Sequence, residues 1–303
     1  MYLQADHTPL LDHDELERLQ SLILERRDRR RAVSSPYSGP AVSLHRGYGM
    51  ELHDVRPYHP GDDIRHMDWR ATARSNKPTT KVFLEERQRS LFVIVDRRPT
   101  MRFGTRGEIK VACAARVASI MAFTALAAQE HVSGLIIENT MTSYPSARTL
   151  AGVFPLLKAV TAPLGNMSLS SQVTPIDLKN VYEHITRHAG RGTTVCIISD
   201  FHDVTDQHKP ALLYLAGQFE TIAIRIVDPA EESLQATGQM RMASPISGKT
   251  IAIDTDDAGI RQRYNEIMAR RSTELRTLFT TAGIQYLAVH NHRDTFQQLS
   301  ALL

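Results

Sequence analysis

The sequence has 303 residues, which is enough for one large domain or two modest ones. Its composition of 42% hydrophobic and 23% charged residues is that of a globular chain and is too apolar for a disordered one. Lys and Arg number 36 against 33 Asp and Glu, and the formal net charge of +3 provides no global field to hold nucleic acid or an anionic membrane. We therefore expect no nucleic-acid partner.

The sequence also predicts a cytoplasmic location without membrane insertion. No uncharged apolar run approaches the roughly 20 residues that a bilayer span requires. The first residues include Asp6 and Asp12 instead of the basic and apolar segments of a secretory signal. Cys113 and Cys196 lie far apart in apolar runs, as expected of buried thiols in a reducing compartment.

Residues 1–90 are predicted to form a separate N-terminal region with a small helix and a β-hairpin. Its helix is expected over residues 15–31, where leucines recur at helical spacing before a cluster of arginines. Cations in the last turn of a helix suit the helix dipole, although the same cluster is also an alternative phosphate-binding patch. Residues 34–40 have the composition of a turn or linker.

Residues 91–303 alternate between short apolar runs and helical patterns. Strands are predicted over residues 91–95, 132–137, 193–199, 221–227 and 285–289, and a hairpin over 240–253. Helices are predicted over residues 108–128, 150–160, 178–189, 211–218, 257–282 and 295–302. This alternation predicts an α/β domain with a mostly parallel sheet and helices on both faces.

Two carboxylates follow predicted strands of this sheet directly. Asp96 comes after the run 91–95, and Asp200 after the run 193–199. Ligands of such sheets bind outside the carboxyl ends of the strands, so these two positions are candidate site residues. A metal-dependent hydrolase using Asp96 and Asp200 is an alternative function.

The common catalytic and nucleotide-binding motifs are absent from the sequence. It contains no GxxxxGK[ST], no GxGxxG after a strand and no GxSxG. His184 and His188 lie one helical turn apart, but the residues between them lack the Glu of a zinc protease, so surface histidines are the preferred interpretation.

The densest cluster of charge surrounds the only Trp, in the block VRPYHPGDDIRHMDWRATAR at residues 55–74. Its positive and negative charges nearly cancel, which favours an ion-paired seam that packs the N-terminal region onto the sheet domain. In that interpretation Trp69 is largely buried, and Arg56 or Arg65 pairs with Asp62, Asp63 or Asp68. The alternative is an exposed recognition surface.

This block resembles the signature of the bacterial family called domain of unknown function 58, R-x-Y-x-x-G-D-D-x-R-x-I-D-W-x-x-x-A-R. The matching residues are Arg56, Tyr58, Gly61, Asp62, Asp63, Arg65, Asp68, Trp69 and Arg74. The resemblance resumes around Asp96 and again at Asp200. It implies a von Willebrand factor A-like sheet domain and an association with MoxR-type AAA+ ATPases, in a family without an established enzymatic activity.

The resemblance also implies a degenerate metal-dependent adhesion site. Such domains hold Mg²⁺ with D-x-S-x-S and with a Thr and an Asp from later loops. Here the positions are Asp96, Thr100 and Asp200, with Thr174 for the distant Thr, while Arg98 replaces the first Ser. A guanidinium cannot ligate a cation and repels one.

The surroundings of this loop are strongly basic. Between Arg87 and Lys110 there are seven basic side chains, Arg102 among them, against two acidic ones. We therefore expect no bound metal or other cofactor. Two roles remain open for Arg98, which are to bind a partner's carboxylate in place of the ion or to neutralise Asp96 and Asp200 in a dead site.

The expected function is a non-enzymatic protein–protein interaction module, an adaptor or co-chaperone of a MoxR-type AAA+ ATPase or of that ATPase's client. The loop residues Asp96, Arg98, Thr100, Arg102, Thr174 and Asp200 form its expected binding or degenerate metal site. The alternatives are the hydrolase described above and a nucleic-acid-binding protein that uses the arginine-rich N-terminal helix.

Overall fold

The computed structural model describes residues 9–33, 51–59, 64–75, 77–84, 89–164, 178–190, 192–243, 250–300 and 302. The chain forms two compact units, a larger one of residues 1–31 and 89–303 and a smaller one of residues 32–88. The division differs from the predicted boundary at residue 90, because the N-terminal helix belongs to the larger unit.

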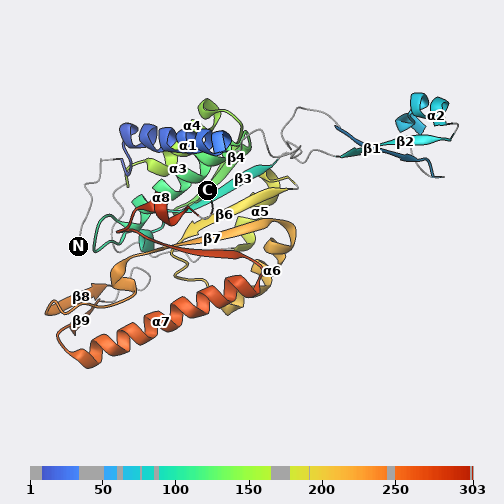
Figure 1. Cartoon of the computed structure of the whole chain (residues 1–303). Coiled ribbons are helices and arrows are strands. Elements are labelled where there is room, and N and C mark those ends of the chain that lie inside the picture. Colours follow the sequence, from blue (N-terminus) through green and yellow to red (C-terminus); the bar gives the residue numbers. More distant parts are fainter. Residues whose placement is uncertain are drawn as a thin grey trace. The chain divides into compact units, whose positions relative to one another are not determined.

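The larger unit is built on a six-stranded sheet (Figure 1). Its strands lie in the order β10-β7-β6-β3-β4-β5, and all neighbours are parallel except β4 and β5, which are antiparallel. Their bounds are Ser90–Asp96 (β3), His131–Ile137 (β4), Met141–Ala147 (β5), Thr193–Ser199 (β6), Glu220–Val227 (β7) and Gln285–His290 (β10). The predicted mostly parallel sheet is thereby confirmed.

Helices cover both faces of this sheet. Their bounds are His13–Val33 (α1), Lys110–Ala127 (α3), Leu150–Thr161 (α4), Leu178–His188 (α5), Lys209–Gln218 (α6), Ala258–Thr281 (α7) and Thr295–Gln298 (α8). Figure 1 shows α1, α3 and α4 on one side and α5, α6 and α7 on the other. Successive side chains of β3 point to opposite faces, with Val93 and Val95 in the core under α3 and Phe92 and Ile94 in the other core.

Helix α1 packs on the larger unit through its apolar side and an ion pair. Leu19 and Ile23 are buried in the core that α3 and α4 share. Arg116 of α3 donates from Nε to Glu15 Oε1 at 2.7 Å. The amide of Leu10, just before α1, donates to the carbonyl of Thr161 at 2.8 Å. These contacts explain why the helix is not part of a separate N-terminal region.

The smaller unit is a two-stranded antiparallel sheet of β1 (Glu51–Pro57) and β2 (Thr79–Leu84). Between the strands lie a 3₁₀ turn, η1 (Ile64–His66), and a short helix, α2 (Trp69–Ser75). The predicted burial of Trp69 is wrong, because its exposed fraction is 66%. Gly61, Asp62 and Asp63, with the ion pairs predicted for them, lie outside the described residues.

The remaining differences from prediction are local. The hairpin is present as β8 (Gln239–Ala243) and β9 (Thr250–Asp254). Strand β5 was not predicted, since its half-exposed sequence MTSYPSA is polar and includes Pro145. Helix α3 is long and apolar enough to cross a membrane, by length and composition, and 78% of it is buried inside the larger unit. Such burial is the setting of a core helix, so the match is weak evidence for a membrane span.

Candidate functional site

Each of the five parallel strands ends at a carboxylate or an amide. These residues are Asp96 as the last residue of β3, Glu138 after β4, Asp200 after β6, Asp228 after β7 and Asn291 after β10, and we call them the charged rim. The chain runs from β3 outward to β4 and β5 and then returns to β6 on the other side of β3. The rim therefore spans a topological switch point, where sheets of this kind bind ligands.

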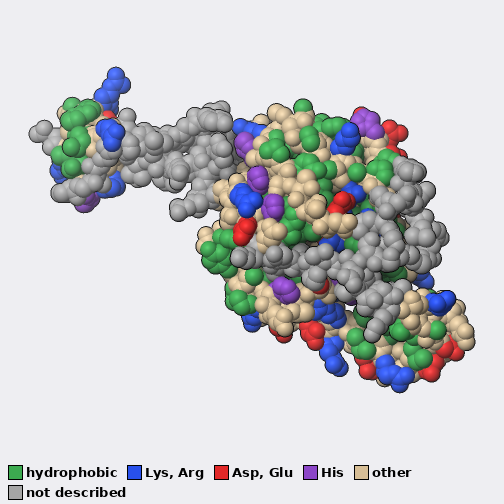
Figure 2. Space-filling model, turned by 180° about the vertical axis from the view of Figure 1, so that it is seen from behind, with side chains coloured by type: hydrophobic (Ala, Val, Ile, Leu, Met, Phe, Trp, Pro, Cys, Tyr) green, Lys and Arg blue, Asp and Glu red, His purple; other side chains and the backbone are tan. Residues whose placement is uncertain are grey.

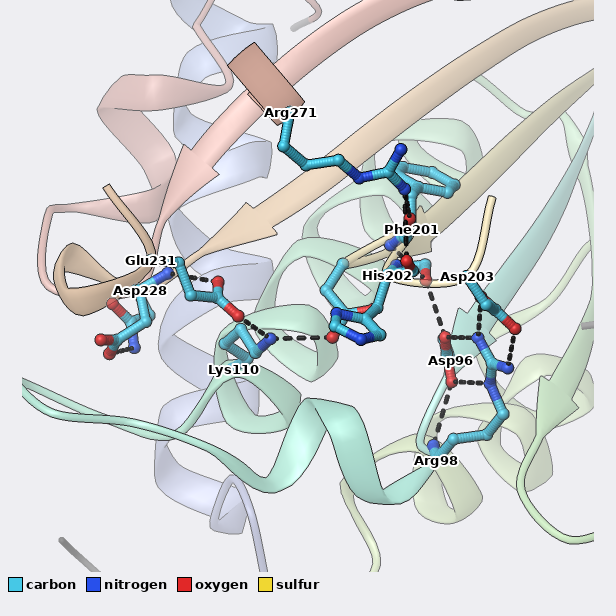
Figure 3. Close-up of polar contacts among 12 residues, drawn as sticks. Asp96, Arg98, Lys110, Phe201, His202, Asp203, Asp228, Glu231 and Arg271 are labelled. Atoms are coloured by element: carbon cyan, nitrogen blue, oxygen red, sulfur yellow. Dashed lines mark hydrogen bonds and ion pairs between the residues drawn. The ribbon is translucent and has the colours of Figure 1, made fainter. Parts of the chain in front are cut away.

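Asp96 is neutralised by the guanidinium of Arg98 (Figure 3). Nε and Nη2 of Arg98 donate to Oδ1 and Oδ2 of Asp96 at 3.0 and 2.8 Å. Nη1 and Nη2 also donate to Oδ2 and Oδ1 of Asp203 at 2.7 and 3.1 Å. Arg98 therefore forms a bidentate ion pair with each carboxylate. The hydroxyl of Ser199 donates to Oδ2 of Asp96 at 2.7 Å.

Burial and pairing act in opposite directions on these charges. The side chains of Asp96 and Arg98 are 1% and 3% exposed. Burial lowers the pKa of Arg98, but the hydrogen bonds and charges of Asp96 and Asp203 raise it further, and its pKa ends above its ordinary value. Burial raises the pKa of Asp96, and the hydrogen bonds and charge of Arg98 oppose that rise. The guanidinium is thus a fixed cation without access to solvent.

Asp200 has a different cation, the ammonium group of Lys110 at the start of α3. Nζ of Lys110 donates to Oδ2 of Asp200 at 2.8 Å and to Oε1 of Glu231 at 2.5 Å. The amide of His202 donates to Oδ1 of Asp200 at 3.1 Å. Burial raises the pKa of Asp200, but the charge and hydrogen bond of Lys110 lower it more, to about 2. Asp200 is therefore ionised at neutral pH.

The rest of the charged rim is also paired. Nε of Arg97 lies 2.8 Å from Oε1 of Glu138, and its guanidinium donates to carbonyls at the end of α4, including that of Val160 at 2.9 Å. The amide and hydroxyl of Thr105 donate to Asp228, the amide at 2.7 Å. Asn291 donates from Nδ2 to Oδ2 of Asp228 at 2.8 Å.

One segment supplies the donors for four of these strand ends. It consists of the β3–α3 connection and the first residue of α3, residues 97–110, and carries Arg97, Arg98, Thr105 and Lys110. The segment therefore fastens β3, β4, β6 and β7 together along the carboxyl edge of the sheet.

The segment after β6 is held in a strained conformation. Phe201 has a positive φ of 53°, which residues other than Gly adopt rarely. Its side chain is buried and packs on Phe279 of α7, with the ring centroids 4.7 Å apart. Arg271, also on α7, donates to the carbonyls of Phe201 and Val204 at 3.0 and 2.5 Å. These contacts fix the backbone that carries Asp200 and Asp203.

The structure brings most of the predicted site residues together. Asp96 and Asp200 lie close enough for their charges to interact. Thr100 and Arg102 lie in the 3₁₀ turn η2 (Pro99–Arg102); Thr100 is buried, and its hydroxyl has no hydrogen-bond partner in the described part of the chain. Thr174 lies outside the described residues.

These residues do not fit a divalent cation as they stand. Both oxygens of Asp96 accept hydrogen bonds from Arg98, and the two oxygens of Asp200 accept from Lys110 and from the amide of His202. Mg²⁺ requires several open oxygen ligands. Within the residues that the structure describes, no group of three or more His, Cys, Asp or Glu is arranged to hold a metal ion.

Sequence reasoning did not single out Asp203, Asp228 and Glu231. A signal existed for Asp228, since it directly follows the predicted strand 221–227 just as Asp96 and Asp200 follow theirs. Asp203 and Glu231 lie in connecting segments, and only the three-dimensional arrangement shows that each shares a cation with a rim carboxylate.

The solved structures that the chain matches include those of two Bacteroides proteins. One is a conserved hypothetical protein BatB from Bacteroides thetaiotaomicron, with 10% identity, a TM-score of 0.41 and coverage of 70% of this chain and 94% of the other. The second is described as an aerotolerance-related membrane protein from Bacteroides fragilis, with 10% identity, a TM-score of 0.40 and coverage of 70% and 95%.

In sequence, the chain is similar to uncharacterized proteins of Mycobacterium bovis and Mycobacterium tuberculosis. It is 26% identical to each over 258 residues, which cover 84% of this chain and 79% of the relative. The profile of a family described as "Protein of unknown function DUF58" matches residues 54–274. The chain therefore belongs to the DUF58 family.

Proposed function

We propose that this protein is a non-enzymatic binding module with a von Willebrand factor A-like larger unit, an adaptor for a MoxR-type AAA+ ATPase or for that ATPase's client. The observation that carries the proposal is the pairing of Asp96 with Arg98 and of Asp200 with Lys110. A hydrolase built on these carboxylates would need at least one of them open to a metal ion or to water. Both are instead enclosed by cations of the same chain.

Of the two roles left open for Arg98, we propose neutralisation. Its side chain is 3% exposed, and Asp96 and Asp203 each take two of its donors. A partner's carboxylate would have to displace one of them and enter a buried position. The guanidinium then only balances the charges of Asp96 and Asp203, while Lys110 balances that of Asp200, and binding of the ATPase is independent of metal.

The cytoplasm as the location is part of the same proposal. The chain carries two buried cysteine thiols, Cys113 and Cys196, which are not joined in a disulfide. Burial raises the pKa of both thiols to about 12, so they remain protonated and unreactive. Free thiols of this kind suit a reducing compartment such as the cytoplasm.

The test is calorimetric titration of the purified protein with a purified MoxR-type ATPase, with EDTA and with added Mg²⁺. The mixture contains no nucleotide, so that the ATPase itself needs no metal. We expect saturable binding with a Kd that EDTA does not change. Absence of binding would contradict the adaptor function, and a Kd that depends on Mg²⁺ would contradict the neutralising role of Arg98. Metal-dependent hydrolysis that Asp200→Asn abolishes would favour the hydrolase.

A further inference from the structure

Arg225 on strand β7 carries a buried charge that no carboxylate balances. Its exposed fraction is 7%, and its Nε is buried without a hydrogen-bond partner. Within the described residues, its guanidinium forms no hydrogen bond and no ion pair. An isolated buried charge costs free energy, and buried charges in folded proteins are therefore paired. Arg225 thus needs an anion as its partner.

The side chain of Arg225 lies on the side of the sheet that α7 covers. Its neighbours Ile224 and Ile226 point into the core under α3, whereas Ala223 points into the other core, to which α7 contributes. Because side chains alternate along a strand, Arg225 shares the face of Ala223. It pairs in register with Ser199, the last residue of β6.

A second guanidinium, that of Arg271 on α7, lies beside this position. Nη2 of Arg271 donates to the carbonyls of Phe201 and Val204, at 3.0 and 2.5 Å, in the segment directly after β6 (Figure 3). These acceptors are neutral, and Arg271 forms no ion pair within the described residues. Burial lowers the pKa of Arg271, and the charge of Arg225 lowers it further. The two guanidinium groups therefore lie within reach of each other's charge.

Tyr286 on the neighbouring strand β10 provides a third donor. Ala288 pairs in register with Arg225, so Tyr286, two residues earlier, lies on the same face of the sheet. Its ring is stacked on that of Phe279 of α7, with the centroids 5.7 Å apart. Its hydroxyl is buried and has no hydrogen-bond partner in the part of the chain that the structure describes. We call Arg225, Arg271 and Tyr286 the arginine site.

Two carboxylates lie near the arginine site without forming an ion pair with it. The charges of Asp203 and Glu274 both act on Arg271. Both oxygens of Asp203 accept hydrogen bonds from Arg98. Glu274 is exposed and forms no ion pair among the described residues. The arginine site therefore has an excess of positive charge and of hydrogen-bond donors.

We infer that the arginine site binds a phosphate ion between β7, β10 and α7. A phosphate group carries about 1.5 to 2 negative charges at pH 7, which matches two guanidinium groups, whereas a carboxylate carries only one. Its oxygens accept hydrogen bonds from the guanidinium groups and from the phenol hydroxyl. The small exposed fraction of Arg225 favours the free ion over a larger phosphate ester. The inference does not depend on the proposed adaptor function.

General attraction of anions to the protein surface is a separate effect. Figure 2 shows Lys and Arg side chains interspersed with Asp and Glu side chains on the described surface of the larger unit. The formal net charge of the chain is +3. Anions held only by such a surface are screened by salt, so the titrations below are made at constant ionic strength with sodium chloride.

The first experiment is calorimetric titration of the full-length protein with sodium phosphate. We expect saturable binding at one site with a Kd below about 1 mM, and a rise of the melting temperature that saturates with phosphate. Acetate should bind at least about tenfold more weakly, because it carries one charge. Glycerol 3-phosphate identifies the source of the phosphate group. Weaker binding of this ester indicates the free ion, and equal binding indicates a phosphorylated molecule at the same site.

The second experiment uses variants of the site. Arg225→Met should weaken phosphate binding by more than about tenfold, and Tyr286→Phe by about threefold or more. In phosphate-free buffer, Arg225→Met should melt at a temperature no lower than the wild type, because the substitution removes an unpaired buried charge. Arg263→Met is the matched control, since Arg263 is exposed on α7 two turns before Arg271. It should bind phosphate as the wild type does.

Glu274→Gln tests whether a residue of the chain is the true partner of Arg225. We expect this variant to bind phosphate at least as tightly as the wild type, because a competing negative charge is removed. A lower melting temperature of Glu274→Gln in phosphate-free buffer, together with weaker phosphate binding, would show that Glu274 supports the site and would overturn the inference.

Three further results would contradict a phosphate site. They are no saturable binding by the wild type up to about 10 mM phosphate, acetate binding as tight as phosphate binding, and an unchanged Kd in a folded Arg225→Met variant. Circular dichroism verifies the fold of each variant. If Arg225→Met does not fold, an unchanged Kd in Tyr286→Phe overturns the inference in its place.

Discussion

Arg98 connects two carboxylates in a position that water does not reach. Removing one member of such a buried group leaves an uncompensated charge, which costs more than the net contribution of the intact group. Asp96 is more dependent on Arg98 than Asp203 is, because the side chain of Asp203 is 13% exposed and that of Asp96 only 1%. The stability of this corner of the charged rim therefore depends on the guanidinium.

We expect Arg98→Met to lower the free energy of unfolding by about 3–5 kcal/mol, as is typical when one partner of a buried ion pair is lost. The double variant Arg98→Met with Asp96→Asn should lose less than the single variant, because it leaves no ionised carboxylate at position 96. Urea unfolding followed by circular dichroism measures both. A loss below about 1 kcal/mol for the single variant would show that solvent reaches Asp96.

Asp200 makes a pH-dependent contribution to the free energy of unfolding. Its pKa in the folded protein is about 2, below the ordinary value of 3.8 that the unfolded chain retains. The unfolded state therefore takes up a proton first as the pH falls, and the stabilisation that is complete above about pH 4 is lost between about pH 4 and about pH 2. The shift corresponds to about 2 kcal/mol.

Asp200→Asn has no such titration. We expect the fall in unfolding free energy from about pH 5 to about pH 2 to be smaller by about 2 kcal/mol in this variant than in the wild type. Urea unfolding at each pH provides the comparison, and the other carboxylates contribute equally on both sides. Parallel pH profiles would mean that Lys110 does not hold Asp200 in its ionised form.

At the scale of elements, the sequence predicted the parallel strands because each is a short, mainly apolar run with a polar residue directly after it. That pattern also located Asp96 and Asp200. It did not predict the pairing of Lys110 with Asp200, which depends on the strand order and on where α3 begins. The burial expected of Trp69 was wrong because Trp residues are highly buried on average but not at every position, and Trp69 is the exposed first residue of the short helix α2.

Helix α1 packs on the larger unit although it is far from that unit's strands in the sequence. More than fifty residues separate it from β3, yet Leu19 and Ile23 belong to the core of the larger unit. We expect Ile23→Ala to cost about 2–5 kcal/mol of unfolding free energy, the range for truncating a buried aliphatic side chain. Leu24→Ala on the same helix is the matched control, because Leu24 is 43% exposed and its truncation should cost no more than about 0.5 kcal/mol.

Equal effects of these two substitutions in urea unfolding would mean that α1 is not packed on the larger unit. The predicted separate N-terminal region would then be correct after all.

At the scale of the whole molecule, the smaller unit is an insertion between α1 and β3. The chain contributes α1 to the larger unit, forms the smaller unit with residues 32–88, and returns at Arg89. Among the described residues, the two hydrophobic cores of the larger unit contain no side chain from residues 32–88. The charged rim lies entirely on the larger unit, because its residues fall between Arg89 and Leu303.

Replacing residues 32–88 with a flexible Gly-Ser linker should therefore leave the larger unit folded, because insertions between compact units are tolerated when few contacts cross the boundary. We expect the unfolding free energy of the remaining unit to stay within about 0.5 kcal/mol of that of the full chain. Trp69 is deleted in this variant, so unfolding in urea is followed by circular dichroism. The acid dependence due to Asp200 should remain, since Lys110 and Glu231 belong to the larger unit. Loss of the cooperative transition, or a fall of several kcal/mol, would show that residues 32–88 complete the core of the larger unit and that the chain is one structural unit.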